Sequence, residues 1–279
     1  MKRYYPNAEY TETIEIALGL TDKYSKSVLF HFYWNGNLNE KHFYSILSCY
    51  YFNVYQNKHR IILWLENNHP NQYNQEIEKY AEIRYFSLHD EKKNTGFLET
   101  YDYAFGDLSH YSDIVRYLLL YNYGGVWLDL DCFILRNFDP LFSTFENEIC
   151  VYQWEYQNYP NGAFYMSLHP KSETMKNNMM YIVDRGMGWG FQIAHLTYDL
   201  PLDLTVLPCS WFDAGWLYNP FNNNFLTFFE DTTSQYTFDT FSKGSFCYHW
   251  HNQWDKTIHE NSTIRQLIHI IHTNLSIES

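Results

Sequence analysis

Short apolar runs alternate along this chain with longer amphipathic segments. The run at 27–34 is apolar and aromatic and stops at Asn35-Gly36, which is typical of a buried strand closed by a turn. Similar short runs predict further strands at 60–65, 83–86, 126–131, 149–154, 163–168 and 204–208. Amphipathic periodicity predicts helices at 38–51, 72–81, 109–122, 173–184 and around 264–271.

Strands that alternate with helices favour parallel pairing through right-handed crossovers, as in a Rossmann-like nucleotide-binding half. We therefore expect an α/β fold with a mostly parallel central sheet flanked by helices. The 279 residues fit one domain, with a nucleotide-binding half at about 25–131 and a second half at about 132–279.

Three local features set element boundaries in this prediction. The stretch 90–96 is polar and is expected to be a loop. Ser109 or Ser112 is expected to cap the helix at 109–122, and Gly124-Gly125 supplies its left-handed stop. The strand at 126–131 then follows at once.

In that strand, alternation places Trp127, Asp129 and Asp131 on one face and three apolar residues on the other. Two carboxylates at positions i and i+2 repel each other, so they need a cation, a proton or a hydrogen-bond donor to be stable together. Oxygen ligands of this kind suit Mg²⁺ or Mn²⁺. The alternative is a pair of exposed aspartates where a strand runs into a loop, because this tripeptide is common by chance.

Asp113 and Arg116 lie three residues apart on the preceding helix and share one face. They fit an ordinary intrahelical salt bridge. An arginine fork beside a diphosphate would also stabilise its departing charge, and Asp113 could accept hydrogen bonds from sugar hydroxyls.

The chain has 19 Lys and Arg against 32 Asp and Glu, so its net charge is 19 − 32 = −13. No stretch gathers the basic residues into a patch, which makes nucleic acid and anionic membranes poor partners. An acidic protein that binds an anionic ligand needs local positive charge to offset its own negative potential, and a divalent cation supplies that charge. The charge therefore makes a metal site plausible.

The cysteines point to a reducing compartment. They are odd in number and form no CxxC pair, namely Cys49, Cys132, Cys150, Cys209 and Cys247. No window approaches the 18 apolar residues of a spanning helix. We expect a soluble, cytoplasmic protein without a transmembrane segment.

The whole run 112–131 closely resembles the signature of the DXD-containing glycosyltransferases of family 32. That family includes capsular polysaccharide and Golgi mannosyl-type enzymes, and the catalytic domain of the large clostridial glucosylating toxins looks similar. The resemblance implies a GT-A fold and a hexosyltransferase of glycan or polysaccharide biosynthesis. It places Asp113, Arg116, Asp129 and Asp131 in the catalytic site, and Trp127 among the residues that bind the nucleotide-sugar.

Two other segments are similar to motifs of that family. The segment 31–36 resembles its first-strand motif, which implies that Trp34 stacks on the donor base with Tyr33 as a neighbour. The segment 248–254 resembles its closing motif, which completes the metal shell. Gln253 and Asn252 stand where a Ser and a Gly are usual.

By position, the resemblance favours His249 and then Asn252 as metal ligands beside Asp131 and Asp129. His251 stays open as a third choice. Without the upstream motif, these histidines would fit a surface aromatic cluster.

By the same resemblance, Trp254 packs on the phosphates or the sugar. Asn161 either meets the transferred sugar or is an ordinary turn residue before a strand. The region 186–216, where acceptors are usually recognised, departs most from the family pattern.

The implied reaction is transfer of a hexose with retention of anomeric configuration. Mn²⁺ or Mg²⁺ neutralises the leaving diphosphate, with Asp131 as direct ligand and Asp129 on ribose, sugar or metal-bound water. A UDP-sugar is favoured over a GDP-sugar as donor, and a saccharide or glycoconjugate as acceptor. The sequence does not identify the sugar, the acceptor, the linkage or the oligomeric state.

Two other functions compete with this interpretation. A phosphohydrolase of the haloacid-dehalogenase type also places DxD after an apolar strand, but Phe133 replaces the expected Thr or Val and no downstream acidic pair is clear. A sugar-binding or nucleotide-binding protein of the same fold that has lost turnover is the second alternative.

Overall fold

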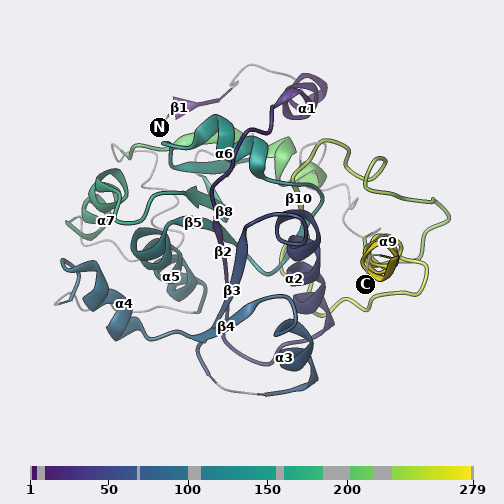
Figure 1. Cartoon of the computed structure of the whole chain (residues 1–279), viewed down its shortest axis with the longest axis horizontal. Coiled ribbons are helices and arrows are strands. Elements are labelled where there is room, and N and C mark those ends of the chain that lie inside the picture. Colours follow the sequence, from purple (N-terminus) through teal and green to yellow (C-terminus); the bar gives the residue numbers. More distant parts are fainter. Residues whose placement is uncertain are drawn as a thin grey trace.

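The computed structural model describes residues 2–4, 10–67, 70–99, 108–154, 160–184, 202–216 and 228–277. Eight strands form its main sheet, which Figure 1 shows almost edge-on with helices on both sides. In spatial order these are β1 (Lys2–Arg3), β9 (Thr205–Pro208), β7 (Cys150–Gln153), β8 (Asn161–Ser167), β5 (Gly125–Leu128), β2 (Leu29–Trp34), β3 (Arg60–Leu65) and β4 (Glu82–Tyr85).

Most neighbours in this sheet are parallel. The pairs β2–β3, β3–β4, β2–β5, β7–β9 and β1–β9 run parallel, whereas β8 is antiparallel to both β5 and β7. The predicted α/β class with a mostly parallel central sheet is therefore confirmed. A small second sheet pairs β6 (Cys132–Ile134) with β10 (Cys247–His249).

The helices divide between the two faces of the main sheet. In Figure 1, α4 (Leu88–Thr95), α5 (Leu108–Tyr123) and α7 (Glu173–Asp184) lie on one side, and α2 (Glu40–Asn53) and α3 (Gln72–Ile77) on the other. The other helices within the described ranges are α1 (Tyr10–Gly19), α6 (Asp139–Phe145), α9 (Thr263–Ile277) and the short η1 (Cys209–Trp211) and η2 (Ala214–Trp216).

Buried side chains form a core on each face. One core packs Val126 and Leu128 of β5 with residues of α2 and α6, and the other packs Trp127 with α5 and α7. A third cluster lies beneath α9. The alternation expected for Val126, Trp127 and Leu128 is therefore confirmed.

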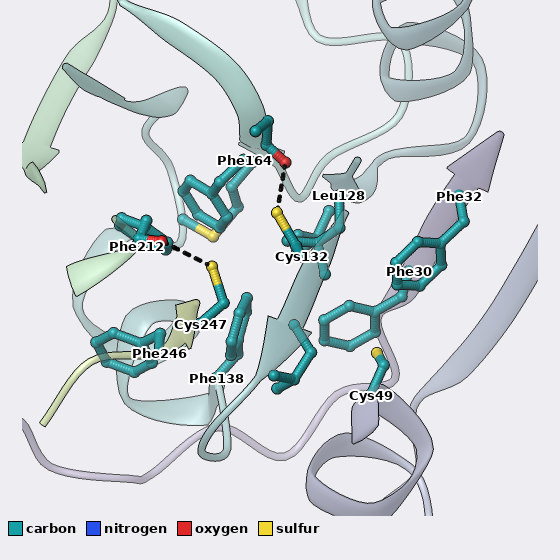
Figure 2. Close-up of a cluster of buried hydrophobic side chains, with 14 of the residues drawn as sticks. Phe30, Phe32, Cys49, Leu128, Cys132, Phe138, Phe164, Phe212, Phe246 and Cys247 are labelled. Carbon is teal, nitrogen blue, oxygen red and sulfur yellow. Dashed lines mark hydrogen bonds between the residues drawn. The ribbon is translucent and has the colours of Figure 1, made fainter. Parts of the chain in front are cut away.

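Aromatic rings fill the first core below the second sheet. Phe164 and Phe212 stack with ring centroids 4.0 Å apart, and Phe246 continues the stack on Phe212. Figure 2 shows Cys132 and Cys247 among these rings, each thiol donating to a backbone carbonyl. This packing anchors β6, which directly follows Asp131, and β10, which ends at His249.

The stretch 90–96 is not the expected loop, because most of it lies in helix α4. Ser87 caps the start of this helix, and Gly96 ends it with a left-handed φ of 77°. Its buried Glu91 accepts hydrogen bonds from Asn122 and Tyr123 at the end of α5. A polar helix of this kind is stabilised by its caps and by long-range contacts, which periodicity alone does not reveal.

Two other boundaries differ from prediction. Helix α5 is described from Leu108, so Ser109 and Ser112 lie within it and not at the predicted position before its start. Strand β5 ends at Leu128, so Asp129 and Asp131 lie in the turn that follows and not in the strand. The predicted helix stop is confirmed at Gly124, whose φ is 66°.

Candidate functional site

Pairing of β6 with β10 brings together two segments that lie far apart in the sequence. His249 is opposite Cys132 in the register, and the Trp250 amide donates to the Asp131 carbonyl over 2.9 Å. The turn after β5 and the segment after β10 therefore meet at one place. This is the arrangement expected for the DxD and closing motifs.

The paired glycines lie where α5 passes into β5, ahead of that turn. A Cβ at Gly125 would lie 2.2 Å from the Leu29 carbonyl oxygen, and one at Gly124 would lie 2.5 Å from the Leu168 carbonyl oxygen. Both residues have positive φ, 66° at Gly124 and 114° at Gly125, which glycine adopts without strain. Close approach and backbone conformation both require glycine here.

Arg116 links the helix to the aspartate turn. Its guanidinium donates to Asp113 over 2.8 Å and to Asp129 over 3.4 Å, and it lies over the Trp127 ring. The Trp127 indole also donates to Asp129, over 2.6 Å. Asp113 and Arg116 are therefore more than an intrahelical pair, because the same arginine reaches the DxD turn.

Burial and neighbouring charges together set the pKa values of Arg116 and Asp129. Burial alone would lower the pKa of Arg116, but Asp113 and Asp129 beside it raise that pKa. Burial raises the pKa of Asp129, with the Asp131 charge adding to the rise and Arg116 opposing it. About a third of the Asp129 side chain is exposed, whereas Arg116 is 9% exposed.

Gly162 forms the other wall of the arginine site. A Cβ at this position would lie 1.8 Å from Nη1 of Arg116, so the guanidinium packs directly against the glycine backbone. The preceding residue, Asn161, begins β8, and its side chain accepts a hydrogen bond from the Ala163 amide. Asn161 therefore lies next to the Arg116 site, although no contact shows a role with a sugar.

Asp131 contacts both candidate residues of the closing motif. Its Oδ1 lies 3.2 Å from His249 Nε2, and its Oδ2 accepts from the Asn252 backbone amide over 2.7 Å. Both Asp131 and His249 are buried. Burial alone would raise the pKa of Asp131, but His249 outweighs it and lowers that pKa to about 2.

His249 shows the reciprocal shift. Burial alone would lower its pKa, but the Asp131 carboxylate raises it well above the usual value. His251 differs, since burial and the neighbouring His249 lower its pKa. The Nε2 atom of His251 lies 2.9 Å from Asp213, whereas that of His249 faces Asp131.

The closing motif turns sharply after His249. His251 and Asn252 both have left-handed φ values, 52° and 56°, which are uncommon for residues other than glycine. The turn places the Asn252 amide on Asp131, while the Asn252 side-chain oxygen accepts from the Trp254 indole over 3.1 Å. Asn252 thus contacts Asp131 through its backbone and orients Trp254 through its side chain.

Two tryptophans and a histidine form an aromatic cluster beside this turn. The Trp34 and Trp254 rings are 5.0 Å apart, and His42 contacts both, stacking on Trp254 at 4.5 Å. Tyr33 lies on the opposite face of β2, where its hydroxyl donates to Glu66 over 3.0 Å. The structure therefore brings Trp34 and Trp254 together, and it separates Tyr33 from them.

Sequence reasoning missed three residues of this region, His42, Tyr152 and Asp213. Asp213 accepts hydrogen bonds from His251, Trp154 and Tyr152, and its side chain is 1% exposed. No local motif marks these residues, because their partners lie on other strands. The isolated acid after the apolar stretch 204–212 was the only signal available.

The donors at this site fit a divalent cation. Asp131, Cys132 and His249 offer ligand atoms within 4.8 Å of one another, as do Asp213, His249 and His251. Asp129, Asp131 and Asp213 place more carboxylate here than Arg116 and His249 neutralise. A cation held by Asp131 oxygen and His249 nitrogen would relieve that excess.

Residues 186–201 of the expected acceptor region lie outside the described ranges. Among the described helices, none combines the length and apolar character needed to span a bilayer.

Residues 55–150 match the family model described as "Glycosyltransferase sugar-binding region containing DXD motif". This matched segment contains Asp113, Arg116, Asp129 and Asp131. Divalent metals are generally used by DXD glycosyltransferases. No curated protein matches the sequence.

Solved glycosyltransferases share the fold. The glycosyltransferase GlyE of Streptococcus pneumoniae TIGR4 aligns with a TM-score of 0.55 at 13% identity, over 91% of this chain and 64% of GlyE. The chain thus spans slightly less than two thirds of GlyE. Mouse xyloside xylosyltransferase 1 aligns with a TM-score of 0.50 at 12% identity, over 84% of this chain and all of that chain. Identities this low show the fold alone.

The family match covers the DxD turn and its helix, and the GT-A fold extends beyond it. Residues 55–150 therefore match the DXD-containing sugar-binding region of glycosyltransferases, and the fold of the chain is one that solved glycosyltransferases share.

Proposed function

We propose that this enzyme transfers a hexose from a UDP-sugar to a hydroxyl of a saccharide or glycoconjugate, with retention of anomeric configuration and with Mn²⁺ or Mg²⁺ as cofactor. It would resemble the transferases of family 32. One observation supports this most directly. Asp131 lies 3.2 Å from His249, next to the turn in which Arg116 contacts Asp129.

Asp131 and His249 would hold the cation, with Asn252 as a further candidate ligand. The cation, when bound, supplies positive charge for the diphosphate oxygens. The Asn252 amide, 2.7 Å from Asp131 Oδ2, would keep that carboxylate turned toward His249. Asp129 would contact ribose, sugar or metal-bound water, because its side chain is the more exposed of the pair.

Arg116 would stabilise the charge that develops on the leaving diphosphate. Its position is fixed before substrate arrives, by Asp113, Asp129 and the Gly162 backbone, so little reorganisation is needed. Asp113 would accept from sugar hydroxyls, and Asn161 beside Gly162 would meet the transferred sugar.

The aromatic cluster would bind the nucleotide. Trp34 would stack on the base and Trp254 on the phosphates or sugar, since their rings are 5.0 Å apart beside the aspartate turn. Trp127 is buried and would act by orienting Asp129 through its indole N–H. Tyr33 would support β2 from the opposite face.

The proposal extends to the whole chain. Residues 1–279 would act as one domain, because β1 near the start of the chain and β9 near position 205 belong to the same sheet as β2 and β5. The enzyme would work in the cytoplasm, in the biosynthesis of a glycan or polysaccharide. All five cysteines are buried and none of them forms a disulfide, which suits a reducing compartment.

A donor panel tests the proposed function. Thermal-shift measurements with UDP-sugars and GDP-sugars, each with and without Mn²⁺, should show one donor that raises the melting temperature only with metal. Release of the nucleotide from that donor should then require Mn²⁺. Binding without any release would favour the inactive sugar-binding alternative, and hydrolysis of an aryl phosphate would favour the phosphohydrolase.

A further inference from the structure

Tyr152 and Asp213 lie behind His249, on the side away from Asp131, and the proposed function leaves both unused. The Tyr152 hydroxyl is 3.0 Å from His249 Nδ1 and 3.3 Å from Asp213 Oδ2. Tyr152 belongs to β7 and Asp213 follows η1, so two separate elements converge on this histidine. Both side chains are 1% exposed.

Hydrogen-bond chemistry sets the direction of this chain of contacts. The Asp213 carboxylate accepts from the Trp154 indole over 2.6 Å, and an indole N–H can only donate. His251 contacts the same carboxylate at 2.8 Å. Asp213 is therefore an acceptor, so the single Tyr152 hydroxyl proton points toward it. The Tyr152 oxygen is then left to accept from His249 Nδ1–H.

This direction selects one form of the His249 ring. With a proton fixed on Nδ1, the nitrogen left to bind a cation is Nε2, which lies 3.2 Å from Asp131 Oδ1. A metal-binding histidine commonly donates its other N–H to an outer acceptor, which fixes ring orientation and tautomer. Here that acceptor is a tyrosine hydroxyl, itself oriented by a buried carboxylate.

We propose that Asp213 and Tyr152 are positioning residues that act in series to hold His249 with Nε2 directed at the cation held by Asp131. This inference rests on the proposed metal site and adds to it two residues that would act through His249. It predicts that removing a single oxygen behind the histidine weakens cation binding, although neither residue touches the cation.

The test measures Mn²⁺ binding to the whole chain directly, from the electron paramagnetic resonance signal of free Mn²⁺, without nucleotide or turnover. Tyr152→Phe removes the hydroxyl and keeps the ring, and it should raise the Mn²⁺ Kd roughly tenfold or more. Asp213→Asn should have an effect of similar size. Because the two residues act in series, the double variant should bind Mn²⁺ about as well as the weaker single variant.

Two control variants separate positioning from general damage. Asp139→Asn removes a buried carboxylate beside a different histidine, His59, and Tyr44→Phe removes a hydroxyl that donates to Glu40. Both should keep the wild-type Mn²⁺ Kd, whatever their melting temperatures. If Asp213→Asn does not fold, Tyr152→Phe alone decides the matter.

The possible outcomes distinguish this inference from the proposed function. Failure of the wild-type chain to bind Mn²⁺ would overturn the metal site and the positioning role together. Wild-type binding with an unchanged Kd in Tyr152→Phe would overturn only the positioning role. Multiplying effects in the double variant would also contradict it, because they would show two independent contributions.

Discussion

Two buried histidine–carboxylate clusters in this protein use the same residue types differently. In the first, His59 Nδ1 accepts from the Val28 amide over 3.1 Å, so Nε2–H donates to Asp139 over 2.6 Å. In the second, His249 lies between two acids, Asp131 and Asp213, with a third carboxylate nearby at Asp129.

The two clusters differ in how many carboxylates stand against the groups that can neutralise or hydrogen-bond to them. The first cluster has one ring and one carboxylate, and Asn137 donates to the remaining oxygen of Asp139, so every group there has a partner. The second cluster has three carboxylates beside one histidine, and a cation would complete it. A buried His–Asp contact alone therefore does not identify a metal site, whereas an excess of carboxylate beside it points to one.

Exchanging one acid for its amide in each cluster should have opposite consequences. Asp131→Asn should lower sugar transfer roughly tenfold to a hundredfold through weaker metal binding. Its stability should fall less than that of Asp139→Asn, because relief of repulsion with Asp129 offsets part of the lost contact with His249. Asp139→Asn should keep the specific activity and lose roughly 3 kcal/mol of unfolding free energy, since it breaks a buried pair.

Transfer rates at saturating Mn²⁺ and urea unfolding curves, measured on both variants, check this pair of predictions. Near-normal transfer by Asp131→Asn would remove that residue from the metal site. A large loss of stability in the same variant would indicate that both clusters serve the fold.

A third buried histidine, His42, extends the comparison. It lies beside two tryptophans and not in either of the two clusters. Its Nδ1 accepts from the Asn39 amide over 2.8 Å, and burial lowers its pKa to about 3. As pH falls below 6.5, the unfolded chain gains a proton on this ring and the folded chain does not, so stability falls with pH. Between pH 6.5 and about pH 5 this loss should amount to roughly 2 kcal/mol.

His42→Gln is the matching variant, because glutamine can accept from the same amide in a capping box and does not titrate. Urea unfolding of both proteins at several pH values should show a shallower acid loss in the variant. Parallel curves would mean that His42 is protonated in the folded state.

How far the sequence could predict this molecule depends on where the partners of each residue lie. Asp113, Arg116 and Asp129 lie within one helix, turn and strand end, so their contacts could be anticipated. Tyr152 and Asp213 reach His249 only through sheet pairing that joins distant segments, and no spacing in the sequence encodes that contact. Their role had to come from the structure.

The same reasoning explains the errors in the predicted fold. Helix α4 is polar, and it is stabilised by its caps at Ser87 and Gly96 and by the contacts of Glu91 with α5, none of which apolar periodicity indicates. Strand β5 stops at Leu128 because the chain must turn to bring Cys132 opposite His249. Apolar runs placed the other predicted strands to within two residues, and only the run at 126–131 extended three residues past the end of its strand.

A substitution at Gly162 tests whether the Arg116 guanidinium must occupy its present position. Gly162→Ala puts a methyl group 1.8 Å from the present position of Nη1, so the guanidinium must move away from Asp129. Transfer should fall roughly tenfold, because a displacement of this size disturbs positioning. Gly19→Ala is the control, since no described atom lies within 4 Å of its Cβ. Equal rates in the two variants would show that Arg116 need not occupy this position.

The smallest effect is expected where opposite charges meet in water. Lys26 and Glu146 form a 2.5 Å ion pair, but 66% and 33% of their side chains are exposed. Solvent and salt screen such a pair, and holding two long side chains together costs conformational freedom. Lys26→Gln should therefore leave the midpoint of urea unfolding unchanged within error at physiological salt, and transfer at the wild-type rate. A clear shift would mean that proximity alone sets the strength of ion pairs here. The contrast between the His59 and His249 clusters would then have to be explained by distance and not by charge balance and burial.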